Sequence, residues 1–182
     1  MEIERQWLVD VPIIPNKDDE RVTDMHRMEQ SYLQLEPEIR VRKKHTELSN
    51  RREIALVDRY YLTFKSNGGL SRIEVEKEIT DREYEELLRL FSVTQTPINK
   101  LQYVMTVKDA ETGGDYKAEL NFVDKGTANE FVYVEVEFSS EKEAKAFKAP
   151  VWFGKEVTYD SSYKMKNIWK KTRLGGEYDE ES

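Results

Sequence analysis

The sequence predicts an α+β protein, mainly β, in which eight antiparallel strands form a closed barrel, or tunnel, with flanking helices. The first observation behind this prediction is that apolar and polar residues alternate with a period of two, not 3.6, over eight segments. The second is that the polar positions of these segments carry charges, often in like-charged pairs. The third is composition: 38% of the 182 residues are hydrophobic and 36% are charged, which suits one domain with a small core.

The alternating segments define the predicted strands. They are residues 2–9, 30–35, 38–43, 59–65, 70–78, 100–107, 116–123 and 131–138. Turn-forming residues rich in glycine join three pairs of these strands, at residues 66–71, 111–116 and 124–129. Residues 44–58 form a longer polar connection.

Two helices interrupt the strands, and each has a clear start signal. Residues 80–91 begin with a capping box, in which Thr80 pairs with Glu83. Near residue 140 the same device recurs with Ser140 and Glu143. An apolar stripe on each helix predicts packing against the sheet.

Since successive strand residues face opposite sides, the charged residues of each segment share one face. These sets are Glu2 and Glu4; Arg40 and Arg42; Thr63 and Lys65; Arg72, Glu74, Glu76 and Glu78; Lys100 and Gln102; Glu119 and Asn121; Glu135 and Glu137. For any one strand, a solvated polar face of an open sheet is the better explanation of the pattern. Over eight strands, repulsion between like charges favours a closed barrel in which a ligand lies between acids and bases.

The chemistry of these faces predicts the kind of ligand. Carboxylates are suitable ligands for a hard divalent cation such as Mg²⁺ or Mn²⁺. Arginine and lysine side chains bind phosphate oxygens, the guanidinium group in a bidentate fashion. A polyphosphate that chelates a metal ion satisfies both sets of side chains.

Composition excludes several other classes. The net charge is −7, and more than half of it comes from Glu177, Asp179, Glu180 and Glu181, so the body has no basic surplus for nucleic-acid binding. There is no cysteine, which excludes a thiolate zinc site. The two histidines are too few to favour a histidine-based metal cluster. No apolar run approaches the ~20 residues of a membrane helix, and no signal peptide opens the chain, so we expect a cytoplasmic protein. We expect residues 1–174 to form the tunnel domain and residues 175–182 to be a disordered acidic tail.

Several motifs, in order along the chain, resemble the CYTH superfamily, the triphosphate tunnel metalloenzymes. They are EIERQ (residues 2–6), QSYL (30–33), IRVR (39–42), LTFKSNGGLSRIEVE (62–76), YVEVEF (133–138) and PVWFGKEVTYDSSYK (150–164). The similarity spans residues 2 to about 170. It implies an eight-stranded tunnel, a divalent metal ion, and hydrolysis of a triphosphate-bearing substrate, either inorganic triphosphate or a nucleoside triphosphate.

The resemblance also assigns roles by position. The implied metal ligands, including carboxylates on the same floor of the tunnel, are Glu2, Glu4, Glu74, Glu76, Glu119, Glu135 and Glu137. The implied substrate-binding residues are Arg40, Arg42, Lys65, Arg72, Lys164, Gln6 and Gln102. Tyr32 and Lys100 match a tyrosine and a lysine near the reacting phosphate, and could position water and neutralise the leaving oxygen.

The sequence departs from the family pattern inside the tunnel. Gln6 stands in place of a lysine, Gln102 of an arginine, Asn121 of an aspartate, Ser162 of a basic residue and Ser31 of a glycine. These changes predict a weaker or altered grip on inorganic triphosphate. They leave open a tunnel with little or no turnover that binds a nucleotide or another phosphorylated small molecule. Adenylate cyclase activity, which the wider superfamily includes, is a further alternative. A monomer or a homodimer is expected.

Overall fold

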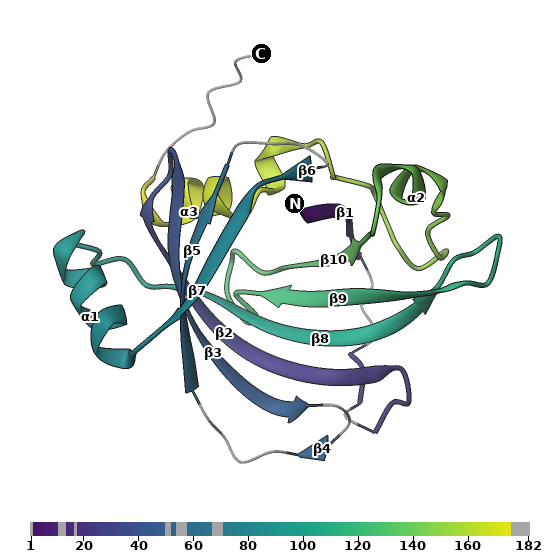
Figure 1. The fold of residues 1–182 in the computed structure, drawn as a ribbon, viewed down its shortest axis with the longest axis horizontal. Coiled ribbons are helices and arrows are strands. Elements are labelled where there is room, and N and C mark those ends of the chain that lie inside the picture. Colours follow the sequence, from purple (N-terminus) through teal and green to yellow (C-terminus); the bar gives the residue numbers. More distant parts are fainter. Residues whose placement is uncertain are drawn as a thin grey trace.

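A strongly curved antiparallel sheet forms the body of the protein, and three α-helices lie at its margins (Figure 1). The computed structural model describes residues 2–10, 14–16, 18–49, 52–53, 58–66 and 71–175. The predicted acidic tail, apart from Gly175, lies outside the described residues, as do parts of the polar connection at residues 44–58. None of the described helices has the length and apolar character needed to cross a membrane.

Both predicted helices are present, and so are the predicted strands, except that the strand predicted at residues 70–78 is divided at Ile73 into β6 and β7. The strands are β1 (Glu2–Leu8), β2 (Val22–Gln34), β3 (Glu38–Ser49), β4 (Arg52–Glu53), β5 (Asp58–Lys65), β6 (Ser71–Arg72), β7 (Glu74–Ile79), β8 (Ile98–Lys108), β9 (Asp115–Val123) and β10 (Phe131–Glu137). The helices are α1 (Asp81–Leu90), α2 (Glu141–Ala146), a 3₁₀ turn (Ser161–Tyr163) and α3 (Met165–Arg173). The predicted capping box is formed at α1, and Ser140 caps α2.

Strand β2 is longer than predicted because its pairing is irregular. It begins eight residues before the predicted start at residue 30. Its register shifts between Met25 and His26 against β3, and between Val22 and Asp24 against β8. Such irregularities break the alternation of apolar and polar residues on which the sequence prediction depends.

The prediction of a closed barrel is not confirmed, because the hydrogen-bonded ladder does not close. The strand order is β6-β1-β10-β9-β8-β2-β3-β5-β7, with β4 paired to β3. The two edges are nevertheless consecutive in sequence, because only Ile73 separates β6 from β7. This one stretch of chain pairs with β1 through Ser71 and Arg72, and with β5 from Glu74 onwards. The ladder is interrupted at Ile73 because the chain there passes from pairing with β1 to pairing with β5.

The polar faces of the strands point into the curve of the sheet. On β5, Thr63 and Lys65 are 0% and 6% exposed, whereas Phe64 between them is 44% exposed. On the adjoining segment Ile73 is 65% exposed and Val75 57% exposed. An open sheet with its polar face in water requires the opposite arrangement, so that alternative is wrong for this part of the sheet.

The main apolar core lies outside the curve, beneath α2. The outward residues of β1, β8, β9 and β10 are buried together with Ala144 of α2 and with Phe147, which follows this helix. Trp7 packs against Phe147 and Phe153, at ring-centroid distances of 5.7 and 5.0 Å. This core fixes the outer side of the strands whose inner side carries the charges.

A second apolar cluster involves α3, a helix that the sequence analysis did not predict. Trp169 of α3 is buried with Ile98 and Val123, and its ring lies 5.7 Å from that of Tyr32. The nine-residue sequence MKNIWKKTR has no side-chain N-cap and few apolar residues. Its position depends on tertiary contacts, which local sequence signals do not encode.

Gly154 is needed where the C-terminal segment pairs with β1. Its backbone N–H donates to Leu8 O at 2.8 Å. A Cβ atom at this position would lie 2.7 Å from the same carbonyl oxygen, so the backbone must move to accept a side chain.

We expect Gly154→Ala to lower the free energy of unfolding by about 1–3 kcal/mol, because it overpacks a backbone contact. Urea denaturation followed by circular dichroism measures this change. Gly114→Ala is the matched control: its Cβ would meet only side-chain atoms, at 3.4 Å or more. It should be neutral or slightly stabilising. Equal stability changes in the two variants would contradict the prediction.

Candidate active site

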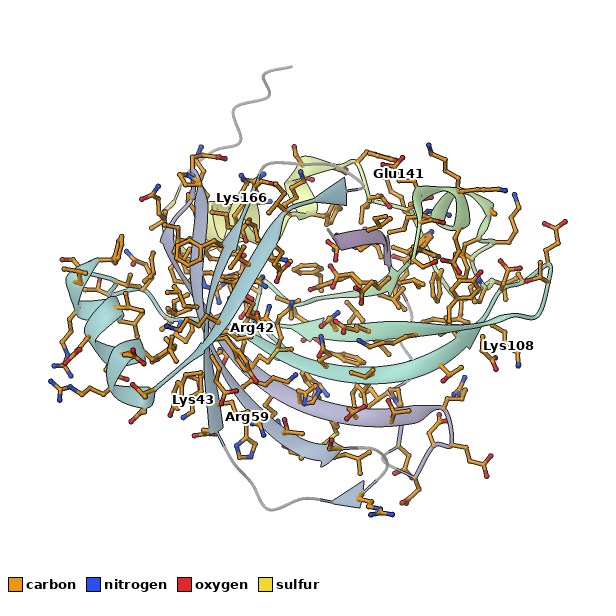
Figure 2. The ribbon with its side chains drawn as sticks, in the orientation of Figure 1. Arg42, Lys43, Arg59, Lys108, Glu141 and Lys166 are labelled. Carbon is orange, nitrogen blue, oxygen red and sulfur yellow. The ribbon has the colours of Figure 1, made fainter. Side chains whose placement is uncertain are left out.

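The charged strand faces meet in a cavity of about 200 Å³. The predicted site residues that line it are Glu4, Gln6, Arg40, Arg42, Lys65, Glu74, Glu76, Lys100, Gln102, Glu119, Glu135 and Lys164. They come from β1, β3, β5, β7, β8, β9 and β10, and from the segment before α3. Figure 2 shows Arg42 near the centre of the view, whereas Lys108 and Glu141 lie at its rim.

Strand register brings these side chains together. Thr63 is paired with Arg40 on one side and with Glu76 on the other. Across the sheet, Glu135 is likewise paired with both Gln6 and Glu119. Directly paired residues point to the same face of a sheet, so one inward residue on each strand places its neighbours inward too.

The sequence analysis missed several residues of the cavity wall. They are Glu38, Tyr133, Thr158, Tyr163 and Met165. Glu38 had a usable signal, because it lies two residues before Arg40 on the same alternating face. Tyr133 had the same signal, because it lies two residues before Glu135 on the same alternating face. Thr158, Tyr163 and Met165 had no such signal, because they lie outside the strands: Tyr163 is in the 3₁₀ turn and Met165 begins α3.

Carboxylates gather at one side of the site. Glu4, Glu119, Glu135 and Glu137 line a small adjoining cavity of about 50 Å³, in which Lys117 is the one cation among the described side chains. Lys117 lies 3.4 Å from Glu119. Among the described residues, no three acidic or histidine side chains are already grouped closely enough to form a metal centre. Glu137 lines only this smaller cavity.

Two predicted site residues cannot be placed as side chains. The backbones of Glu2 and Arg72 are directly paired between β1 and β6. Their side chains lie outside what the structure describes, so the roles predicted for them stay predictions.

Cations occupy the opposite side of the cavity, and two of them share an acidic partner. Lys65 forms an ion pair with Glu74, and Arg40 lies 3.8 Å from the same carboxylate. Buried Gln30 supports the arginines: its Oε1 accepts from Arg40 Nη1 and from Arg42 Nη2, each at 3.3 Å. Gln30 belongs to the QSYL motif, although the sequence analysis gave it no role.

Arg42 and Lys100 are cations that form no ion pair with any carboxylate whose side chain is described. Burial, and then the neighbouring Arg40, lower the pKa of Arg42. Burial lowers the pKa of Lys100 to about 8, against the opposing field of Glu135. A buried and a half-buried cation without a described ion-pair partner are costly, and a bound anion would offset that cost.

Tyr32 does not line the cavity. It is 4% exposed, packs on Trp169, and its hydroxyl oxygen accepts a hydrogen bond of 2.8 Å from Gln30 Nε2. Gln30 therefore connects Tyr32 to Arg40 and Arg42, because its side chain bonds to all three. Its predicted catalytic role stays a prediction.

Comparison with characterised proteins identifies the family. An inorganic triphosphatase of Nitrosomonas europaea is 36% identical over 132 residues, which cover 72% of this chain and 74% of that protein. The chain belongs to the inorganic triphosphatase family. An inorganic triphosphatase of Acetivibrio thermocellus is 33% identical over 114 residues, 62% of this chain and 67% of that protein. No family model matches the sequence.

A solved structure supports the same assignment. The inorganic triphosphatase NE1496 has a TM-score of 0.55 and 27% identity, over 92% of this chain and 93% of that one. The sequence-based prediction of a triphosphatase agrees with membership of the inorganic triphosphatase family.

The departures from the family motifs can now be placed in this inorganic triphosphatase homologue. Gln102 and Asn121 are directly paired, and Gln102 Nε2 donates to Asn121 Oδ1 at 3.1 Å. The same amide nitrogen donates to Glu119 Oε2 at 2.8 Å. Gln102 replaces the arginine of the family pattern and Asn121 replaces its aspartate. Because one positive and one negative charge are absent, these two departures leave the net charge of the site unchanged. Ser162, by contrast, bonds to Asp160.

Proposed function

We propose that the protein hydrolyses inorganic triphosphate in the cavity between its charged strand faces, with a divalent metal ion as cofactor. We further propose that it is a CYTH-type tunnel enzyme. One observation carries the proposal. Within the part of the chain that the structure describes, a single site holds two cations, Arg42 and Lys100, that form no ion pair with a carboxylate, and beside them a cluster of carboxylates in which Lys117 is the one cation. The activity named for its relatives supports the same conclusion.

The carboxylate cluster is suited to a divalent metal ion. The side chains that would hold it are Glu4, Glu119, Glu135 and Glu137, which share one small cavity. Their oxygen atoms are the hard donors that Mg²⁺ and Mn²⁺ prefer. A cation of charge +2 offsets the repulsion among them, which Lys117 alone does not balance. When bound, such an ion neutralises phosphate oxygens.

The cationic side would hold the phosphate chain. Arg40 and Arg42 are fixed by Gln30 and present their guanidinium groups to the cavity. Lys65, anchored by Glu74, adds a third positive charge. Fixed donors of this kind favour the charge distribution of phosphoryl transfer, in which placement and electrostatics supply most of the catalysis.

Lys100 is the residue best placed to act on the reacting phosphoryl group. Water attacks the terminal phosphorus and the phosphoanhydride bond breaks, so that triphosphate and water give pyrophosphate and phosphate. Negative charge grows on the bridging oxygen that leaves. A buried ammonium group without a carboxylate partner stabilises that charge more strongly than a solvated one.

Phosphate release from tripolyphosphate, ATP and thiamine triphosphate tests the proposal. With Mg²⁺ or Mn²⁺ we expect the wild-type protein to be most active on tripolyphosphate, and a metal chelator to abolish this activity. Glu4→Gln should lower kcat/KM by at least about a hundredfold, because it removes a charged ligand at constant size. Glu141→Gln, an exposed change on α2, is the matched control. A wild-type protein no faster than Glu4→Gln would overturn the proposal.

Nucleotide binding without turnover remains the second candidate, because neutral Gln6 and Gln102 line the cavity. The Gln102 amide is already engaged by Glu119 and Asn121, which leaves less of it for a ligand. Thermal stabilisation by ATP without phosphate release would favour this candidate. Formation of cyclic AMP from ATP would instead favour a cyclase.

A further inference from the structure

Tyr133 of β10 lines the candidate active-site cavity, and its hydroxyl group has no partner in the part of the chain that the structure describes. The residue is 1% exposed. Its hydroxyl oxygen is buried, and no hydrogen-bonding group of the described residues reaches it. Buried tyrosine hydroxyls almost always find a partner, because an unsatisfied one loses its bonds to water without replacement.

The packing around the Tyr133 ring does not require the hydroxyl. The ring stacks on Phe131 at a centroid distance of 5.7 Å and belongs to the apolar cluster around Trp169. The ammonium nitrogen of Lys100 lies 5.2 Å from the ring centroid, a cation–π contact. A phenylalanine would make all of these contacts without burying an unsatisfied polar atom.

The surroundings of the hydroxyl indicate what it can bind. Tyr133 lines the same cavity as Lys100 and Arg42, the cations that form no ion pair with a described carboxylate. A tyrosine hydroxyl can donate a hydrogen bond as well as accept one. Since the hydroxyl has no partner among the described residues, it is a hydrogen-bond donor available to a ligand.

We propose that Tyr133 is a substrate-binding residue, whose hydroxyl donates a hydrogen bond to an oxygen of the phosphoryl group held by Lys100. This inference rests on the proposed function and deepens it. Lys100 lies over the face of the Tyr133 ring, and both residues line the same cavity, so a phosphoryl group held by Lys100 would lie close to this tyrosine. Tyr32, the tyrosine that the sequence analysis favoured, already has its hydroxyl bonded to Gln30.

Tyr133→Phe tests this role, because it removes one oxygen atom and keeps the ring. We expect kcat/KM for tripolyphosphate to fall by about ten- to a hundredfold, the loss typical of one hydrogen bond to a charged group. We expect the melting temperature without ligand to stay the same or rise, because an unsatisfied polar atom has been removed. The increase in melting temperature caused by tripolyphosphate should become smaller.

Tyr103→Phe is the matched control. Tyr103 lies in the core outside the curve of the sheet and does not line the cavity. This variant should match the wild-type protein in kcat/KM and in the increase in melting temperature caused by tripolyphosphate.

The outcomes separate the two proposals. If the wild-type protein binds and hydrolyses tripolyphosphate and Tyr133→Phe does so equally well, the inference about Tyr133 is wrong and the proposed function stands. A large drop in the melting temperature of unliganded Tyr133→Phe would also overturn the inference, because the hydroxyl would then be structural. If the wild-type protein neither binds nor hydrolyses tripolyphosphate, both proposals fall.

Discussion

Lys100→Ala is expected to lower kcat/KM for tripolyphosphate by about a hundredfold to a thousandfold. The ammonium group is buried, faces the cavity and has no carboxylate partner among the described side chains, so its charge is available to a phosphate ligand. Removing one preorganised donor from the site of developing negative charge has effects of this size in other enzymes. Steady-state phosphate release at saturating metal concentration measures the change.

The pH dependence of the same residue gives an independent check. The charged groups that act on Lys100 are Glu135 and Glu119, which raise its pKa, and Arg42 and Arg40, which together with burial lower it to about 8. Since the ammonium form is the active one, kcat/KM should be greatest below pH 8 and should fall as the pH rises through 8. The decline of kcat/KM with pH reports the pKa of this group in the free enzyme.

Lys100→Arg separates this titration from that of the substrate. A guanidinium group stays charged to pH 12 or above, so any variant activity should lack the decline centred near pH 8. Titration of tripolyphosphate affects both proteins equally and cancels in the ratio of their kcat/KM values. A ratio that does not change with pH between 7 and 9 would contradict the role given to the Lys100 charge.

Arg173→Ala should lower the free energy of unfolding by about 3–5 kcal/mol, the typical effect of removing one partner of a buried ion pair. Arg173, at the end of α3, binds Asp124 through two hydrogen bonds of 2.6 and 2.8 Å. The two side chains are 8% and 2% exposed. Without Arg173, the Asp124 carboxylate loses its counter-charge and α3 loses its attachment to the loop after β9.

Chemical denaturation measures this effect, and an exposed arginine provides its control. Arg82 of α1 forms an ion pair with Glu86, but its side chain is 85% exposed. Arg82→Ala should change stability by less than about 1 kcal/mol. Asp124→Ala should cost nearly as much as Arg173→Ala, and the double variant less than the sum of the two. Full additivity would contradict a direct interaction between them.

The sequence predicts the strands and most of the cavity wall because both depend on a local pattern. Alternation assigns each strand residue to a face, and paired like charges identify the face that needs a ligand. On β3 this reasoning places Arg40 and Arg42 correctly on the wall of the cavity. It extends across the sheet because direct pairing keeps neighbouring residues on the same side.

The sequence does not predict features that depend on packing between distant segments. Trp169 fixes α3 against Tyr32 and Ile98, which lie far from it in sequence. Gln30 supports the two arginines only because β2 and β3 are in the observed register. Tyr133 occupies an inward position in a strand rich in apolar residues. The sequence of this strand does not distinguish it from an aromatic residue of the core. Its importance depends on the missing hydrogen bond.

The predicted loss of charge from the site also needs three-dimensional context. In the sequence, Gln102 replaces a cationic residue of the family pattern and Asn121 replaces an anionic one. In the folded protein they bond to each other, so the two losses compensate. The expectation of weaker binding of triphosphate therefore depends on Gln6 and Ser162, the two uncompensated replacements of a basic residue.

The outward apolar residues on β5 and on the segment formed by β6 and β7 have a consequence for protein engineering. Phe64, Ile73 and Val75 resemble the exposed hydrophobic residues that are routinely replaced to improve solubility. Here they contribute to the contrast between the apolar and polar sides of these strands. Replacing all three with polar residues would weaken that contrast, and a slip of one residue, which puts Lys65 and Glu74 in water, would be penalised less.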